Sequence, residues 1–222
     1  RRRRRSPAAV RGGRARRAGF TDDGAALVQD GDEKHVSADA VVLACGGASW
    51  PELGSDGAWR TPLTTLGAAI TPLEASNAGV QVDWPPGVAA LAGAPFKTIG
   101  VTVGAARFKG EAILTAQGLE GGAIYAAGAS IRKALRAGAP ALIHLDLQPQ
   151  REAAAIAAKL ASRDPRRSLG PWLQKTLGLS APAARLLTMM AETREPEALG
   201  RLIKAFPVAV RGMAPIARAI ST

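Results

Sequence analysis

The sequence predicts a mixed fold, part α/β and part α+β, on three observations. Residues 38–47 form a continuous apolar run that ends in two glycines, which is typical of a strand buried on both faces of a parallel sheet. Residues 73–147 contain short β-like segments separated by glycines. Residues 150–206 are dominated by alanine, leucine, arginine and glutamate, which favour short helices.

The first expected element is a β-hairpin, because residues 25–28 and 35–36 flank a polar turn. The apolar run follows it as a buried strand. A glycine-rich loop over residues 48–57 comes next. We expect a helix after it that begins near Ser55, whose hydroxyl can cap it, and ends near Gly67.

Further strands and helices are expected downstream. The expected strands cover residues 80–84, 98–103, 112–115, 141–147 and 208–210, and a helix covers residues 122–135. Within residues 150–206, prolines recur where first helical turns are expected, which predicts about three or four short helices. These prolines are Pro165, Pro171, Pro182 and Pro196.

Composition narrows the class of protein. The chain has 222 residues, of which 47% are hydrophobic, and no apolar run approaches the roughly 18 residues of a membrane-spanning helix. One cysteine, Cys45, excludes an internal disulfide and a multi-cysteine zinc site. We therefore expect a cytoplasmic protein without a metal centre and without a membrane partner.

The net charge of +11 is concentrated at one end of the chain. Residues 1–18 contain nine arginines and no acidic residue. Such a segment is typical of a disordered basic tail, which attracts nucleic-acid phosphate without sequence specificity. A basic nucleic-acid-binding protein is therefore one alternative function.

The stretch most informative about chemistry covers residues 41–51. A strand that stops at small residues lets a ligand approach the backbone, and glycine tolerates positive φ, so that amides can point at a phosphate. In open α/β sheets, ligands lie at the carboxyl ends of the strands. The alternative is that the two glycines merely make a tight turn.

The run Val-Val-Leu-Ala-Cys-Gly-Gly resembles the second flavin-contacting strand of two-dinucleotide-binding (Rossmann-like) flavoproteins, and residues 46–59 resemble the YhiN/BaiN-like, or aminoacetone-oxidase-family, flavoproteins. Residues 109–122, 144–149 and 203–222 resemble later blocks of that family in the same order. The resemblance implies an FAD-dependent oxidoreductase with flavin-mediated electron or hydride transfer, with NAD(P) as a second candidate cofactor. It leaves the small-molecule substrate and the catalytic residues unassigned. The implied cofactor-binding residues are Ala44, Cys45, Gly46, Gly47, Ser49 and Gly54.

Composition and resemblance together divide the chain into five parts. They are a disordered basic tail (1–18), a partial FAD-binding domain (19–72), a β-rich insert (73–147), a helical cluster (148–206) and a return towards the β-rich and FAD domains (207–222). The chain contains no Gly-x-Gly-x-x-Gly opening a βαβ unit, and the family continues beyond the block that ends here at Thr222. The resemblance thus implies an internal fragment that is inactive alone, and an inactive gene remnant is a further alternative.

Other candidate residues have structural alternatives beside the chemical ones. Cys45 replaces a common threonine, and we expect it to be a buried, inert thiol rather than a redox group. The family's Phe-Thr-His reads Leu-Thr-Ala at residues 114–116, which removes a histidine. His144 with Asp146 could act together on one strand face, and Glu120 could be a general base or an acid at a helix N-terminus.

Overall fold

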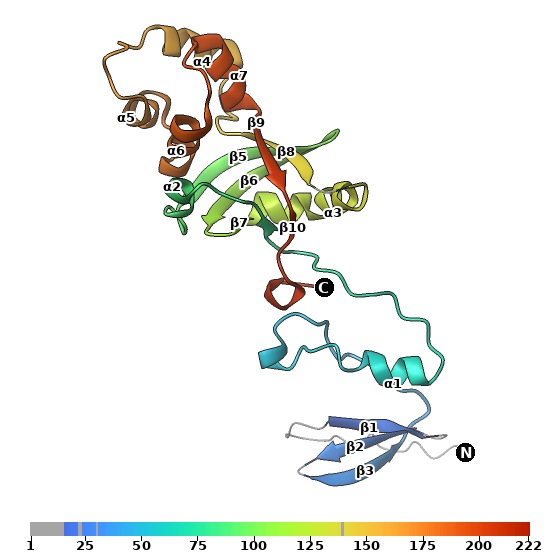
Figure 1. Ribbon diagram of the computed structural model, residues 1–222. Helices are drawn as coiled ribbons and strands as arrows, with labels where there is room; N and C mark the ends of the chain where they lie inside the picture. The colour runs from blue at the N-terminus through green and yellow to red at the C-terminus, as the bar shows by residue number, and fades with distance from the viewer. Residues whose placement is uncertain (1–15, 22–23, 30, 139) are drawn as a thin grey trace, which may run out of the picture. The chain divides into compact units, whose positions relative to one another are not determined.

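The computed structural model describes residues 16–21, 24–29, 31–138 and 140–222 (Figure 1). The chain divides into two compact units. The first unit consists of Arg1–Gly46 and Ala58–Ile70, and the second of Gly47–Gly57 and Thr71–Thr222. In the residues described, no helix is long and apolar enough to cross a membrane.

The first unit contains a three-stranded antiparallel sheet in the order β1 (Arg16–Thr21), β2 (Gly24–Gln29) and β3 (Asp32–Ser37). The expected hairpin is confirmed, because Gln29 pairs with Asp32 across the turn. The assignment of residues 16–18 to a disordered tail is wrong, since they begin β1. An edge strand requires backbone pairing on one side only and tolerates charged side chains. The rest of the expected tail, residues 1–15, lies outside the described residues.

The buried strand expected over residues 38–47 is not present. This segment belongs to no strand, and its apolar side chains are exposed, with Val42 88% accessible and Val41 41%. An apolar run becomes a buried strand only when other strands supply hydrogen bonds on both sides. Within the first unit's described residues, the sheet consists of β1, β2 and β3 alone.

The expected helix begins later than Ser55. Pro51–Leu53 form a single 3₁₀ turn, η1, and α1 spans Arg60–Thr65. Gly54 and Gly57 have φ of 92° and 67°, in the left-handed region, so a right-handed helix cannot run through them. The expected end near Gly67 is confirmed by the last turn, where the Gly67 amide bonds to the Thr64 carbonyl at 2.9 Å.

The second unit is built on a seven-stranded antiparallel sheet of order β10-β4-β7-β6-β5-β8-β9. The strands are β4 (Val80–Gln81), β5 (Pro95–Val103), β6 (Ala106–Thr115), β7 (Gly118–Glu120), β8 (Ala141–Asp146), β9 (Phe206–Val210) and β10 (Gly212–Met213). The strands expected over 98–103, 112–115, 141–147 and 208–210 are confirmed. The strand expected over 80–84 is present, but it is only two residues long. The two edge strands, β9 and β10, are separated in sequence by Arg211 alone, which indicates that the sheet curls until its edges meet.

Helix α3 (Gly122–Arg136) packs against β5 and β6, as Figure 1 shows, and confirms the helix expected over 122–135. Its apolar residues recur at helical spacing, and Ile124 and Ile131 are fully buried. Val101 and Leu114 of the sheet are fully buried in the same core. Complete burial of side chains of this size stabilises the fold by about 1.5–3 kcal/mol each.

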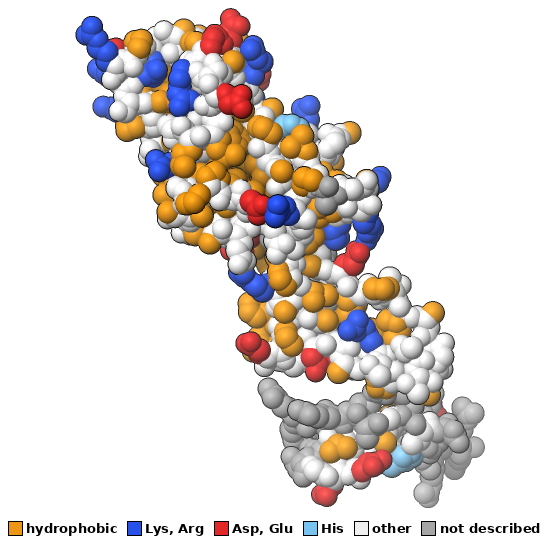
Figure 2. All heavy atoms as spheres, viewed as in Figure 1, with side chains coloured by type: hydrophobic (Ala, Val, Ile, Leu, Met, Phe, Trp, Pro, Cys, Tyr) orange, Lys and Arg blue, Asp and Glu red, His pale blue; other side chains and the backbone are white. Residues whose placement is uncertain are grey.

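Four helical segments form the cluster expected over 150–206. They are α4 (Ala153–Ala161), α5 (Leu169–Trp172) continuing into η2 (Leu173–Leu177), α6 (Ala181–Met190) and α7 (Pro196–Lys204). Pro171, Pro182 and Pro196 lie in first turns as expected, whereas Pro165 lies in a turn before α5. Besides η1 and α3, the described part of the second unit contains two further, short helices outside the cluster: α2 (Pro86–Ala89) and η3 (Ile216–Arg218). On the face in Figure 2, acidic and basic side chains are interspersed over the cluster.

Candidate functional site

The six residues with an implied cofactor role fall in both units. Ala44, Cys45 and Gly46 belong to the first unit, and all three are exposed. The other three, Gly47, Ser49 and Gly54, belong to the second unit. They share one segment, Gly47–Gly57, which we call the glycine-rich loop.

Within the second unit, the glycine-rich loop is held by the segment that follows β10. The Trp50 amide donates to the Ala217 carbonyl at 3.3 Å, and the Ala48 amide donates to Oγ1 of Thr222 at 3.1 Å. An ideal Cβ on Gly47 would lie 1.8 Å from that same oxygen. Glycine at position 47 therefore leaves room for the Thr222 hydroxyl in this position, and any larger residue would displace that side chain.

The loop itself has an unusual backbone. Among the described residues, Trp50 is the single non-glycine in the left-handed region, with φ 59° and ψ 58°. The Leu53 amide bonds to the Trp50 carbonyl at 2.9 Å, and the Gly54 amide bonds to that of Pro51 at 2.9 Å. A bulky residue in this conformation is strained, and such strain is concentrated at functional sites. Gly54 faces open space, with no heavy atom within 4 Å of an ideal Cβ.

Helix α3 supports the same region through two arginines. The Arg132 guanidinium donates to the carbonyls of Ala75 at 2.7 Å and Ser76 at 3.2 Å, and the Ser76 amide donates to the Ser221 carbonyl at 2.8 Å. Arg136 bonds to the Glu74 carboxylate and holds the pKa of Glu74 below its ordinary value. Ser76 therefore links the segment after β10 to α3, the helix that packs on the sheet.

In the first unit, the end of the apolar run has its own contact. The Trp59 indole Nε1 donates to the Gly46 carbonyl at 3.0 Å, and Gly46 has φ 71°. The expectation that Cys45 is buried is wrong, because its thiol is exposed. That expectation depended on a strand that the run does not form.

Two other candidate side chains, those of Asp146 and Glu120, belong to the framework of the second unit. Asp146 forms an ion pair of 2.7 Å with Lys204, whose ammonium also donates to the Arg151 carbonyl at 2.7 Å. This contact joins the end of β8 to α7. Glu120 is the last residue of β7 and lies before the N-cap of α3, Gly121, so it is not in the first helical turn.

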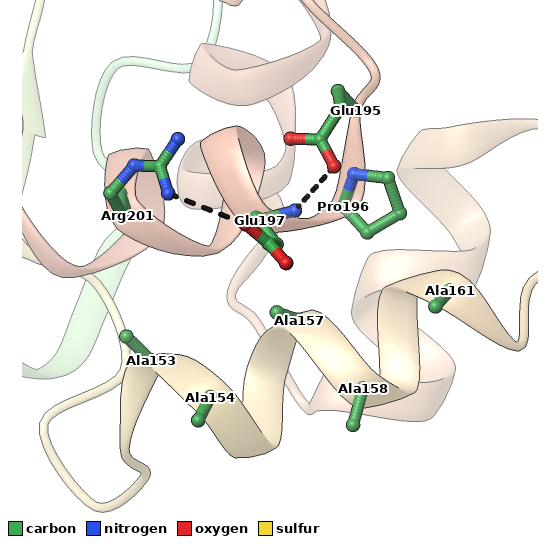
Figure 3. Close-up of a pocket in the computed structure, with 9 residues that line it drawn as sticks. All are labelled: Ala153, Ala154, Ala157, Ala158, Ala161, Glu195, Pro196, Glu197 and Arg201. Carbon is green, nitrogen blue, oxygen red and sulfur yellow. Dashed lines mark hydrogen bonds and ion pairs between the residues drawn. The ribbon is translucent and has the colours of Figure 1, made fainter.

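A pocket of about 500 Å³ lies between α4 and α7 (Figure 3). One side consists of methyl groups, from Ala153, Ala154, Ala157, Ala158 and Ala161. The charged groups opposite them already have partners. The Glu195 carboxylate accepts from the amides of Glu197 and Ala198, which lowers its pKa, and Glu197 lies 3.8 Å from Arg201. The Arg201–Glu197 pair is long and exposed, so the pocket has no buried charged group aimed into it among the residues drawn.

Sequence reasoning assigned no site role to Thr222 or Arg132. The signal for Thr222 was its place in the resembling block at the end of the chain, but its contact with Gly47 depends on tertiary structure. The residues that the structure describes contain no group of three or more His, Cys, Asp or Glu side chains that could hold a metal ion.

Comparison with known proteins gives one family. Residues 74–221 match the model described as HI0933-like protein barrel and H2TH domain. The matched range begins before β4 and covers the curled sheet, the helical cluster and the segment up to Ser221. The glycine-rich loop lies outside it. A search of curated proteins gave no match.

Proposed function

The chain belongs to the HI0933-like protein family, and from that premise we propose that it forms part of an FAD-dependent oxidoreductase. The match spans about two thirds of the chain, and membership of this family supports an FAD-dependent, oxidoreductase-type flavoprotein. It gives no support to NAD(P) as a second cofactor, so the proposal is confined to FAD.

The observation that carries the proposal is the backbone of the glycine-rich loop. A left-handed turn at glycine has no Cβ between the backbone and a ligand, so a cofactor can approach such a turn closely. Trp50 and Gly54 have the left-handed conformation, and Gly54 leaves open space where a side chain would stand. The amides of Trp50 and Gly54 already donate to the carbonyls of Ala217 and Pro51, so the turn would offer close backbone approach and not free donors. The loop is fixed before any ligand arrives, because Thr222 and Ala217 hold it by hydrogen bonds.

When bound, the flavin would supply the electron or hydride transfer, and the protein would supply orientation. In this proposal, Gly54 of the loop lies against the cofactor. Ser49, which the resemblance also implies, is buried in the second unit at 7% accessible and therefore supports the loop from within. Ala44, Cys45 and Gly46 offer an exposed backbone with no bulky side chain. Gly47 contributes to the site indirectly: because glycine has no Cβ, the Thr222 side chain can lie against the loop at this position.

We further propose that this chain supplies only one side of the FAD site. Val41, Val42 and Leu43 are exposed, although their composition is that of a buried strand. Pairing with another strand in the FAD-bound protein would bury them and extend the run into a Rossmann-like sheet. The chain alone is then expected to bind FAD poorly.

The test is to fuse the chain to a Gly-x-Gly-x-x-Gly nucleotide-binding segment from a family member and to measure flavin absorbance after purification. We expect one flavin per chain in the fusion, and none with Gly46→Val, which adds a branched side chain at a left-handed position. A matched control is Ala116→Val, at an exposed position far from the run in sequence. Absence of flavin from the fusion, or its retention by Gly46→Val, would contradict the proposal.

A further inference from the structure

A cavity of about 650 Å³ lies in the second unit, where the sheet meets the helical cluster. Three segments line it: residues 94–99 at the start of β5, residues 147–151 after β8, and residues 177–182 at the start of α6. None of them belongs to the glycine-rich loop. The volume is in the range of small-molecule sites, about 300–1,000 Å³.

The charges that line this cavity are all positive. Lys97 and Arg151 line it, and its lining residues include no aspartate or glutamate. Among the residues described, neither side chain forms an ion pair or a hydrogen bond. Two acids lie near Arg151 in sequence: Asp146 is paired with Lys204 at 2.7 Å, and Glu152, the N-cap residue of α4, does not line the cavity. Two cations without protein partners therefore share one cavity.

Lys97 is placed there by a bulge in β5. Phe96 pairs with Ala112 and Ile99 with Gly110, so β5 has one residue more than β6 in this interval. A bulge changes the direction of the side chains around it and is common beside functional sites. The bulge thus interrupts the β5–β6 ladder beside the cavity.

The remaining lining favours a ligand with an apolar body. Its exposed apolar groups are those of Pro95 and Ala181, and behind them lie buried side chains that are at most 5% accessible: Phe96, Ile99, Leu147, Leu177 and Leu179. The walls are also fixed: the Gln148 side-chain amide donates to the Leu177 carbonyl at 2.8 Å. The ten-residue helix α6 starts on the cavity, and the positive end of its dipole favours an anion there.

We propose that this cavity binds a small organic anion, a carboxylate carried on an apolar body. The Arg151 guanidinium binds the carboxylate as a planar pair of donors, and Lys97 adds a second charge. The apolar walls cover the rest of the molecule. The inference stands apart from the proposed flavin site, because it uses different residues and needs no cofactor.

The test titrates the full chain with 4-phenylbutyrate by isothermal calorimetry, and in parallel with the neutral 4-phenylbutyramide. We expect saturable binding of one carboxylate per chain, and at least about tenfold weaker binding of the amide, because the amide lacks the charge-assisted bonds. Equal binding of the two compounds, or no binding of the carboxylate, would overturn the proposal.

Variants locate the binding. Arg151→Met and Lys97→Met should each weaken the carboxylate at least about tenfold, whereas Lys133→Met, which removes an exposed charge from α3, should leave it unchanged. Ala181→Glu is the second test, because an acid in the first turn of α6 favours the helix but repels an anion in the cavity. Full affinity in Ala181→Glu would place the anion elsewhere and overturn the assignment.

Discussion

Oγ1 of Thr222 lies where a side chain on Gly47 would have to stand, 1.8 Å from an ideal Cβ, and it also accepts a hydrogen bond from the Ala48 amide at 3.1 Å. One hydroxyl therefore contacts the glycine-rich loop at two neighbouring residues and occupies the space that a side chain at position 47 would need. Because the loop carries the proposed cofactor contacts, its conformation depends on a residue 174 positions away from Ala48 in the sequence.

Gly47→Ala should destabilise this junction by about 1–3 kcal/mol, the usual cost of forcing a methyl group into filled space. Thermal melting gives the loss of stability, and limited proteolysis after β10 should show earlier cleavage. The control is Gly122→Ala, where nothing lies within 4 Å of an ideal Cβ. Thr222→Ala should partly rescue Gly47→Ala, and simple additivity of the two changes would contradict the contact.

Lys204→Met should destabilise the second unit by about 1–2 kcal/mol, because Asp146 loses an ion pair in which both side chains are only 22% exposed. A double-mutant cycle with Asp146→Asn measures the coupling. The matched control is Arg201→Met, which removes a longer and exposed pair with Glu197 and should cost under about 0.5 kcal/mol. Equal effects of the two variants would show that the joint between β8 and α7 does not depend on this pair.

Stability should depend on pH through Glu74. The hydrogen bond from Arg136 lowers the pKa of Glu74 in the folded chain from its ordinary value of 4.5. The stabilisation is thus fully present above pH 4.5 and is lost as the pH falls through the lowered value. Glu74→Gln should melt earlier than wild type at pH 7, and the difference should disappear in acid. Arg132 lies 3.6 Å from the same carboxylate, so the difference should shrink, but not vanish, in an Arg136→Met background. A difference that stays constant with pH, or that is undiminished in Arg136→Met, would contradict this origin.

An element can be predicted from the sequence when its own residues show a pattern, such as apolar spacing, that reflects its burial. Helix α3 and strand β8 were expected within one residue of their bounds, because their apolar spacing reports burial directly. The prediction of a buried strand over residues 38–47 was wrong, because an apolar run does not specify which strands will pair with it. The curl of the sheet, with its edges joined through Arg211, was not expected, since strand order is a long-range property.

The candidate site, too, could be predicted from the sequence only in part. The glycines were visible in the sequence, and the left-handed φ of Gly46, at the end of the apolar run, and of Gly54, in the glycine-rich loop, agrees with the conformational reason for choosing them. The start of the helix was misplaced, because Ser55 resembles an N-cap but lies between two left-handed glycines. Lys97 was not singled out at all, since a strand bulge leaves no mark in composition.

Val42→Asp should change the melting temperature of the chain very little, because the side chain is already 88% exposed and surface changes cost about 0.5 kcal/mol or less. In the fusion with a nucleotide-binding segment, the same change should abolish flavin retention, since the proposed strand would bury the new charge. Val101→Asp, at a fully buried position, should unfold the chain in both settings. Normal flavin content in the Val42→Asp fusion would show that the run does not become a buried strand.

Any affinity for nucleic acid should reside in residues 1–15, which contain seven of the chain's arginines and no acid. A chain that starts at Arg16 keeps all of β1 and should melt at the same temperature as the full chain, whereas one that starts at Gly24 loses β1 and should melt earlier. Contacts from an arginine run are to phosphate, so binding of the full chain to DNA should fall steeply with salt and show little sequence preference. Titration of the chain that starts at Arg16 decides the matter, because sequence-specific binding that persists there would make nucleic-acid recognition the leading function in place of flavin chemistry.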